Sequence, residues 1–295
     1  MKYETAQYTL MGDRSMNQDR YLIMEAPDAI LLALADGMGG HPKGEKAAQI
    51  LMDNARKAFL TSSKPISNPR FFLSGLMEMS HREILEFGAQ QEPPIEPRTT
   101  GVLCLVQEEN AYWAHIGDSR LYVMRNGVIH IRTDDHSYVE HLRQQGLISA
   151  AQVHTHKFRN YVTRCLGGTN NRPVAELSGP HELQEGDVVL LCSDGFWGPL
   201  AERPMVDALF KEEASLVKKV ARLANDAAAT SHPESDNVTV VALRWCETEA
   251  KLAPADVSMT LTRKKRDLLN TPSEQVDVRN AINDLRKFVD DIDTD

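Results

Sequence analysis

Four aspartates lie next to expected buried strands, where a carboxylate can bind a metal ion. They are Asp36, Asp118, Asp194 and Asp236. A carboxylate at the mouth of a buried strand is poorly solvated, and several at one sheet edge repel one another. Divalent cations relieve that repulsion, and a set of oxygen ligands favours Mg²⁺ or Mn²⁺ over zinc. The four positions together therefore indicate a site for hard metal ions.

Each aspartate also has an ordinary interpretation. Asp36 and Asp194 each follow an apolar run and precede a glycine, which is the usual composition of a turn. Asp118 lies in Gly117-Asp118-Ser119-Arg120, which also fits a simple hairpin. Asp236 fits a loop that leads into a strand. Only the combination of all four favours a metal site.

Near the N-terminus, Arg14 precedes Asn17-Gln18-Asp19. An arginine fork can bind a phosphoryl group through two hydrogen bonds, although a surface Arg–Asp pair alone contributes little. The glycine-rich residues 37–44 do not form a nucleotide-binding loop, because Glu45 stands where a P-loop requires lysine. His154 and His156 fit a solvated helix end better than a metal pair, and no serine or cysteine nucleophile motif is present.

The composition limits the classes of partner. The 295 residues have a mass of 33.0 kDa, a net charge of -9 and no dominant basic block, which argues against nucleic acid. The first ten residues lack the apolar core of a signal peptide, and the longest apolar run, residues 29–35, is too short to cross a membrane. The four cysteines form no C-x-x-C pair, so we expect a cytoplasmic protein.

The hydrophobic pattern predicts strands that alternate with helical segments. Strands are expected at 21–25, 29–35, 101–106, 111–116, 121–124, 128–131, 188–192 and 238–243. Helical segments are expected at 44–60, 71–87, 137–158 and 204–230. Within 137–158, Gly146 is expected to end one helix, and Ser149-x-x-Gln152 can cap the next. Asn126-Gly127 is a strong two-residue hairpin signal, and such short turns favour antiparallel sheets.

The C-terminal part differs in character. Residues 248–295 begin as a polar linker with a basic run and end in an amphipathic segment, 278–292, whose apolar residues share one face. We expect a catalytic domain of residues 1–247 followed by a linker and a helix that docks on this domain or on a partner.

Eight short motifs occur in an order that resembles the type 2C (PPM) metal-dependent protein phosphatases, and most closely their bacterial members. They are Arg14…Asn17-Gln18-Asp19, residues 36–41, Thr99-Thr100-Gly101, residues 117–120, Asp135-His136-Ser137, residues 163–167, residues 192–195 and residues 236–239. Any one of these motifs is weak, but eight in family order over residues 5–245 make chance implausible.

The resemblance implies an α+β fold, a four-layer α-β-β-α sandwich of two antiparallel sheets flanked by helices. It implies two ions of Mn²⁺ or Mg²⁺, with the metal ligands Asp19 (through water), Asp36, the Gly37 carbonyl, Asp194 and Asp236. Asp118 matches a position that holds a third ion together with Asp194. Arg14 matches the phosphate-binding arginine, and residues 137–160 match a flap beside the site.

Two departures from the family pattern concern catalysis. Met38 stands where animal members carry a histidine proposed as the general acid, and Gln18 stands where many members have glutamate. Bacterial-type members share both features. The proton donor is then either His41 or a water held by metal.

The expected reaction is hydrolysis of phosphoserine or phosphothreonine by direct attack of a metal-bridged water, reversing a Ser/Thr kinase in signalling. The expected partners are phosphorylated proteins and a cognate kinase, with no nucleic acid and no membrane. Two alternatives stay open: a phosphopeptide-binding scaffold that has lost its metals, and a hydrolase of small phosphate esters. Metal binding separates the first alternative from the expected reaction, and relative turnover of phosphoprotein and metabolite separates the second.

Overall fold

Runs of β-branched and aliphatic residues form the centres of two β-sheets. In the computed structural model, which describes residues 2–153, 155–168, 174–211 and 213–246, β3 (Ala29–Ala35) and β4 (Gly101–Gln107) are buried along their whole length. Strands covered on both faces have to be apolar at every position, which explains why these segments alternate poorly.

Each sheet has five strands, and all neighbouring strands are antiparallel. The first sheet has the order β1 (Tyr3–Leu10), β10 (Val238–Trp245), β9 (Val188–Cys192), β6 (Arg120–Arg125) and β7 (Val128–Arg132). The second sheet has the order β2 (Arg20–Ala26), β3, β4, β5 (Asn110–Ile116) and β8 (Glu176–Glu182).

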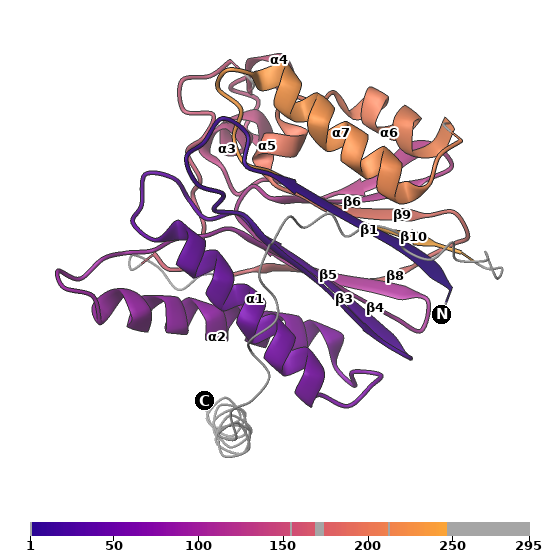
Figure 1. The fold of residues 1–295 in the computed structure, drawn as a ribbon, viewed down its shortest axis with the longest axis horizontal. Helices are drawn as coiled ribbons and strands as arrows, with labels where there is room; N and C mark the ends of the chain where they lie inside the picture. The colour runs from indigo at the N-terminus through magenta and orange to yellow at the C-terminus, as the bar shows by residue number, and fades with distance from the viewer. Residues whose placement is uncertain (1, 154, 169–173, 212, 247–295) are drawn as a thin grey trace, which may run out of the picture. The chain divides into compact units, whose positions relative to one another are not determined.

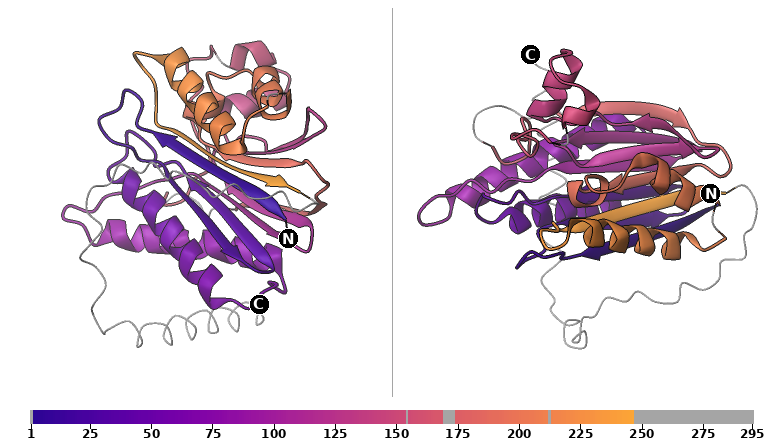
Figure 2. Two further views of the ribbon diagram at one scale, coloured as in Figure 1. Left: turned by 45° about the vertical axis from the view of Figure 1, so that its right-hand side comes forward. Right: turned by 90° about the horizontal axis from the view of Figure 1, so that it is seen from above.

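Helices cover the outer face of each sheet (Figures 1 and 2). The second sheet packs against α1 (Gly44–Thr61) and α2 (Pro69–Ala89), and the first packs against α5 (Asp194–Trp197), α6 (Glu202–Lys211) and α7 (Leu216–Ser231). A third apolar core, which includes Leu32, Val102 and Leu191, fills the space between the sheets. The predicted α-β-β-α sandwich is therefore confirmed.

The predicted turn at Asn126-Gly127 is confirmed in detail. Asn126 and Gly127 adopt φ values of 52° and 74°, as a tight hairpin between β6 and β7 requires. The β2–β3 connection also has two residues, Pro27 and Asp28, between the paired residues Ala26 and Ala29.

The sequence pattern missed two edge strands. β1 is largely polar, and it pairs with β10 from Tyr3–Trp245 to Leu10–Val238. β8 contains Gly179-Pro180, a pair that argues against a strand from sequence alone. An edge strand needs only one hydrogen-bonded neighbour and less burial, so its composition is less constrained.

One helical segment is divided where the sequence did not predict it, and another is divided at the predicted place. The segment 204–230 forms α6 and α7, and Ser215 stands at the N-cap of α7. The segment 137–158 contains only α3 (Tyr138–Gln144) and the single turn α4 (Ala150–Val153). Gly146, with φ of 72°, follows the end of α3 because glycine readily adopts this left-handed conformation.

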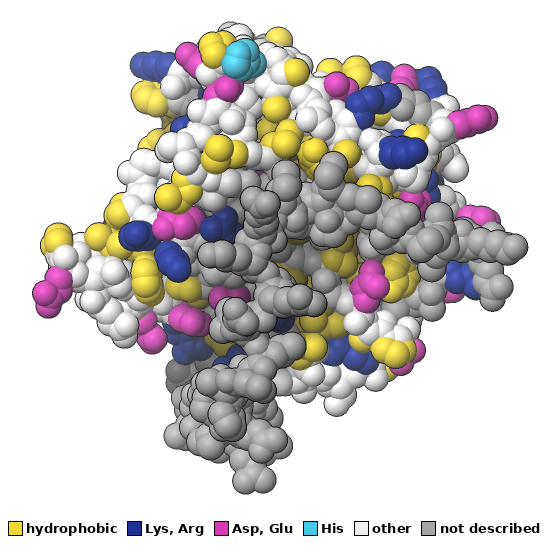
Figure 3. All heavy atoms as spheres, viewed as in Figure 1, with side chains coloured by type: hydrophobic (Ala, Val, Ile, Leu, Met, Phe, Trp, Pro, Cys, Tyr) yellow, Lys and Arg dark blue, Asp and Glu magenta, His cyan; other side chains and the backbone are white. Residues whose placement is uncertain are grey.

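All described residues belong to one unit, Met1–Lys251. The expected linker and helix of residues 248–295 lie outside the described residues. Within the described part of the chain, no helix is both long and apolar enough to span a bilayer. Figure 3 shows acidic and basic side chains interspersed over the visible face.

Candidate metal centre

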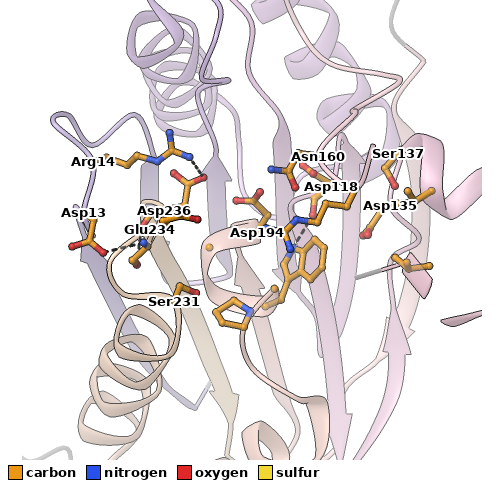
Figure 4. A pocket seen from close by; sticks show the side chains of 18 of the residues that line it. Asp13, Arg14, Asp118, Asp135, Ser137, Asn160, Asp194, Ser231, Glu234 and Asp236 are labelled. Carbon is orange, nitrogen blue, oxygen red and sulfur yellow. Dashed lines mark hydrogen bonds and ion pairs between the residues drawn. The ribbon is translucent and has the colours of Figure 1, made fainter. Parts of the chain in front are cut away.

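The ends of strands from both sheets bring five carboxylates to one region. They are Asp19, Asp36, Asp118, Asp194 and Asp236. A cavity of about 580 Å³ is lined by Asp118, Asp194 and Asp236, and also by Arg14. An adjoining cavity shares these four residues and adds Asp36 and Gly37. Figure 4 shows Asp118 and Asp194 facing the same space.

Asp36 follows β3 directly and is fixed through its backbone. Its N–H donates to the Thr100 hydroxyl at 3.0 Å, and its carbonyl accepts from the Thr100 N–H at 2.9 Å. At Gly37 a Cβ atom would lie 2.5 Å from the backbone of Gly44 and 2.8 Å from the Gln18 carbonyl. Only glycine fits there, so the chain after the carboxylate can pass close to Gly44, the first residue of α1.

Asp19 is buried, with one oxygen paired and one unpaired. Its Oδ2 accepts a 2.9 Å hydrogen bond from the Ser193 hydroxyl, which itself accepts from the Thr239 N–H. Its Oδ1 has no hydrogen-bond partner in the described structure although it is buried. Ser193 therefore connects the start of β2 with the end of β9 and the start of β10.

Asp194 and Asp236 lie close together because the residue after Asp194 is a glycine. Asp194 begins α5, and a Cβ atom on the next residue, Gly195, would lie 2.1 Å from the Asn237 carbonyl. Asp236 accepts a hydrogen bond from the Arg14 guanidinium at 2.8 Å and another from the Asn237 N–H. The glycine lets the α5 turn lie against the loop before β10.

The turn that carries Asp118 is held from two sides. The Gly117 N–H donates to His136 Nδ1 at 3.2 Å, and the His136 N–H donates to the Gly117 carbonyl at 2.9 Å. On the other side, the indole N–H of Trp197 donates to the Asp118 carbonyl at 2.9 Å. Asp118 is thus buried and positioned independently of any ligand.

A buried ion pair, which the sequence pattern did not predict, supports Trp197. Arg120 forms a bidentate pair with Asp135 at 2.7 and 2.8 Å, and it also donates to the Tyr122 hydroxyl. The Arg120 guanidinium carbon lies 3.3 Å from the centroid of the Trp197 ring. Arg120 and Asp135 both lie within quoted motifs, but nothing in their spacing indicates that they pair.

Burial and mutual repulsion raise the pKa values of the clustered carboxyls. Burial, followed by the charges of Asp194 and Asp236, raises the pKa of Asp19 to about 7. Burial and then Asp236 raise the pKa of Asp194 to about 6. The pKa values of Asp36 and Asp118 are also raised, first by burial and then by the neighbouring aspartates.

The donor set fits hard divalent cations. Asp19 Oδ1 and Asp194 Oδ1 are both buried without a hydrogen-bond partner, a costly state for a carboxylate oxygen. The surrounding donors are oxygens, which Mg²⁺ and Mn²⁺ prefer. Within the described residues, no three of these carboxylates place one oxygen each within 4.8 Å of one another. The five carboxylates are therefore spread more widely than the ligands of a single ion.

Arg14 and His41 differ in their relation to the cavity. Arg14 lines both cavities with a side chain that is 55% exposed, so its guanidinium can reach a ligand. His41 is not among the lining residues of either cavity. Burial, then the positive charge of Arg98, lowers the pKa of His41.

A second cluster of donors does not have the geometry of a metal site. His115, His136 and Glu176 bring one donor atom each within 4.8 Å of one another. However, the two imidazole rings are stacked at 4.7 Å with an angle of 8° between their planes. Parallel stacked rings cannot both direct an in-plane lone pair at one ion. His136 instead accepts a hydrogen bond from the Gly117 N–H. The pair His154 and His156, for which the sequence favours a solvated helix end over a metal site, includes His154, which lies outside the described residues.

Comparison with known proteins agrees with this fold. Residues 11–235 match the family model of protein phosphatase 2C. The chain is 34% identical over 214 residues to the serine/threonine protein phosphatase PstP of Mycobacterium tuberculosis, a match that covers 72% of this chain and 40% of PstP. The chain thus spans less than half the length of that relative.

Solved structures give the same result. The crystal structure of the phosphatase Stp1 from Staphylococcus aureus has a TM-score of 0.78 and 28% identity, with 84% of this chain and 96% of that chain covered. The PstP catalytic domain in complex with two manganese ions has a TM-score of 0.69 and 29% identity, with 83% and 99% covered. The sandwich of two antiparallel sheets is therefore the fold of these phosphatases. The chain belongs to the protein phosphatase 2C family.

Proposed function

We propose that this chain hydrolyses phosphoserine and phosphothreonine in proteins and so reverses a Ser/Thr kinase. The observation that carries the proposal is a group of five carboxylates, two with unpaired buried oxygens, beside an exposed arginine in an open cavity. Membership of the protein phosphatase 2C family supports the same activity.

The residues proposed to hold two divalent cations are Asp19, Asp36, the Gly37 carbonyl, Asp194 and Asp236, with Asp118 and Asp194 for a third. The reported complex of PstP with two manganese ions supports this assignment, although Mg²⁺ suits the same ligands. When bound, such ions lower the pKa of a coordinated water and neutralise charge on the phosphoryl oxygens.

The chain's own residues orient the reaction. The Arg14 guanidinium already contacts Asp236 at the cavity wall, so a phosphoryl group bound there would meet its remaining N–H donors. A water oxygen forms the new bond to phosphorus, the bond to the serine or threonine oxygen breaks, and that oxygen receives a proton. Arg14 favours the step because negative charge accumulates on the phosphoryl oxygens. The proposed donor of that proton is His41 or a water held by metal.

The test is Mn²⁺-dependent release of phosphate from a phosphothreonine peptide by the wild-type chain and by Asp36→Asn and Asp194→Asn. We expect activity only with metal, and a loss of at least about a hundredfold in each variant. Full activity in either variant would contradict the assignment. Faster turnover of a small phosphate ester than of any phosphopeptide would favour a metabolite hydrolase, and calorimetry without a Mn²⁺ signal would favour a binding protein.

We also propose a cytoplasmic location, phosphoproteins as substrates and a cognate kinase as the opposing enzyme. All four cysteines are unpaired, which supports a reducing compartment. The proposed catalytic domain comprises residues 1–247 with a flap at about 137–160. The proposed role of residues 248–295, docking on this domain or on a partner, rests on the amphipathic pattern of the sequence.

A further inference from the structure

Three exposed aromatic side chains gather in the segment beside the cavity. Tyr138, Phe158 and Tyr161 are 37%, 46% and 61% exposed, and they account for three of the four exposed aromatic residues in the described part of the chain. Tyr138 packs edge-on against Phe158 at 5.9 Å and against Tyr161 at 6.3 Å. We call these three residues the aromatic cluster. Exposed aromatic groups of this kind typically bind other proteins.

The backbone around the aromatic cluster is ordered by hydrogen bonds. The Tyr138 N–H donates to the Tyr161 carbonyl at 2.9 Å, and the Tyr161 N–H donates to the Phe158 carbonyl at 3.1 Å. His156 Nδ1 accepts from the Phe158 N–H, and its ring lies 5.8 Å from that of Phe158. The rings are therefore already arranged before a partner arrives, which lowers the entropic cost of binding.

The aromatic cluster is continuous with the candidate active site. Its neighbours in sequence, Ser137, Arg159 and Asn160, line the larger cavity, and Val162 lines the adjoining one. Figure 4 shows Ser137 and Asn160 on the same side of the cavity as Asp118. Since an extended chain advances about 3.3 Å per residue, a peptide with its phosphoryl group in the cavity would reach the cluster within a few residues.

The charge of the same segment indicates which peptides it attracts. Residues 138–164, which include the aromatic cluster, contain four basic residues (Arg143, Lys157, Arg159 and Arg164) and one acidic residue, Glu140, which pairs with Arg143, in a chain of net charge -9. The Lys157 ammonium lies 4.8 Å from the centroid of the Phe158 ring. A phosphorylated or acidic peptide is complementary to this segment, whereas a second copy of this acidic chain is less so.

We propose that the aromatic cluster determines sequence preference by binding a large apolar side chain that lies two to four residues from the phosphorylated serine or threonine. This inference rests on the proposed phosphatase function and names the substrate class of the same site. The aromatic cluster takes no part in the hydrolysis, so its contribution is confined to substrates that carry the apolar residue.

The test uses the full chain with Mn²⁺ and a series of phosphothreonine peptides in which one phenylalanine moves from position -4 to +4 in an alanine–serine background. We expect phenylalanine at one or two positions to raise kcat/KM about tenfold over the background peptide. Phe158→Ala and Tyr161→Ala should remove that gain and leave hydrolysis of p-nitrophenyl phosphate unchanged. Phe71→Ala, which truncates the fourth exposed aromatic residue on α2, is the matched control and should keep the gain.

Two results would overturn the inference: no positional effect of phenylalanine in the wild type, or an effect that survives both variants. Dissociation of a wild-type dimer by Phe158→Ala, without a change in peptide preference, would assign the surface to self-association instead. If no peptide is hydrolysed at all, the proposed function fails. Binding of the same peptides, measured by fluorescence anisotropy, then decides the inference, since a phenylalanine-dependent affinity lost in Phe158→Ala supports it and its absence contradicts it.

Discussion

The indole N–H of Trp197 donates a hydrogen bond of 2.9 Å to the carbonyl oxygen of Asp118, while the face of the same ring contacts the Arg120 guanidinium. One side chain thereby joins the short helix α5, which begins with Asp194, to the turn that carries Asp118. The relative positions of these two carboxylates depend on Trp197.

Replacing Trp197 with phenylalanine should distinguish its role in positioning Asp118 from its contribution to the stability of the fold. The variant keeps an aromatic face for Arg120 but loses the N–H, so we expect unfolding free energy to fall by about 1 kcal/mol. Mn²⁺ affinity, measured by calorimetry, should fall several-fold because Asp118 is less well held. Trp245→Phe, at the end of β10, is the control and should leave Mn²⁺ affinity unchanged. Unaltered metal binding in Trp197→Phe would remove the positioning role.

Asp36→Asn should lower activity and raise stability in the absence of metal. The neutral amide cannot replace the carboxylate as an anionic ligand, but it removes one charge from a group of mutually repelling aspartates. Urea unfolding in the presence of a chelator should therefore show a higher midpoint for Asp36→Asn than for wild type. With saturating Mn²⁺ the order should reverse. A lower midpoint without metal would show that repulsion at Asp36 is unimportant.

The stability of the metal-free protein should fall as pH rises through the range in which Asp194 and Asp19 titrate. The pKa of Asp19 is raised to about 7 and that of Asp194 to about 6, so the folded state holds protons that the unfolded chain has released. This contribution is fully present below the unfolded pKa of about 4 and is lost as pH rises through the folded values. Thermal unfolding at several pH values measures it. Asp19→Asn should flatten the profile, and an equally steep profile in that variant would contradict the assignment.

Arg14→Lys should reduce kcat/KM for a phosphopeptide by about tenfold or more. Lysine keeps the positive charge but loses the planar fork that can hold both a phosphoryl group and Asp236. Because the Arg14 side chain is more than half exposed, its contact with Asp236 contributes little to folding. The thermal midpoint of the metal-free variant should therefore stay within a few degrees of wild type, and wild-type kinetics in Arg14→Lys would exclude a role in phosphate binding.

Gly195→Ala should disturb the site through the backbone. The added Cβ atom would lie 2.1 Å from the Asn237 carbonyl, which forces apart the segments that carry Asp194 and Asp236. We expect a loss of stability of about 1–3 kcal/mol and a larger proportional loss of activity. The control is Gly75→Ala, within α2, where a Cβ atom meets nothing within 4 Å. That change should be neutral or stabilising by up to about 1 kcal/mol.

Some site residues and turns could be predicted from the sequence, because the type of residue and its place beside an apolar run indicate the same structure. Asp36 and Asp194 could be found because each follows a fully apolar run, and the β6–β7 hairpin because Asn-Gly suits its turn. The supporting contacts could not be found in this way. Arg120 and Asp135 lie 15 residues apart, and Trp197 reaches Asp118 over 79 residues. Such pairs depend on which strands become neighbours in the first sheet, where β6 lies between β7 and β9, and local patterns do not encode this order.

The arrangement of the five carboxylates has a consequence for synthesis of the protein. They come from loops scattered between residue 19 and residue 236, and β10, which follows the last of them, lies inside its sheet between β1 and β9. A growing chain on the ribosome cannot assemble the acidic group until β10 has emerged and inserted between those two strands. The proposed phosphatase activity would therefore appear only once the domain is complete, so that a partly made chain would be inactive.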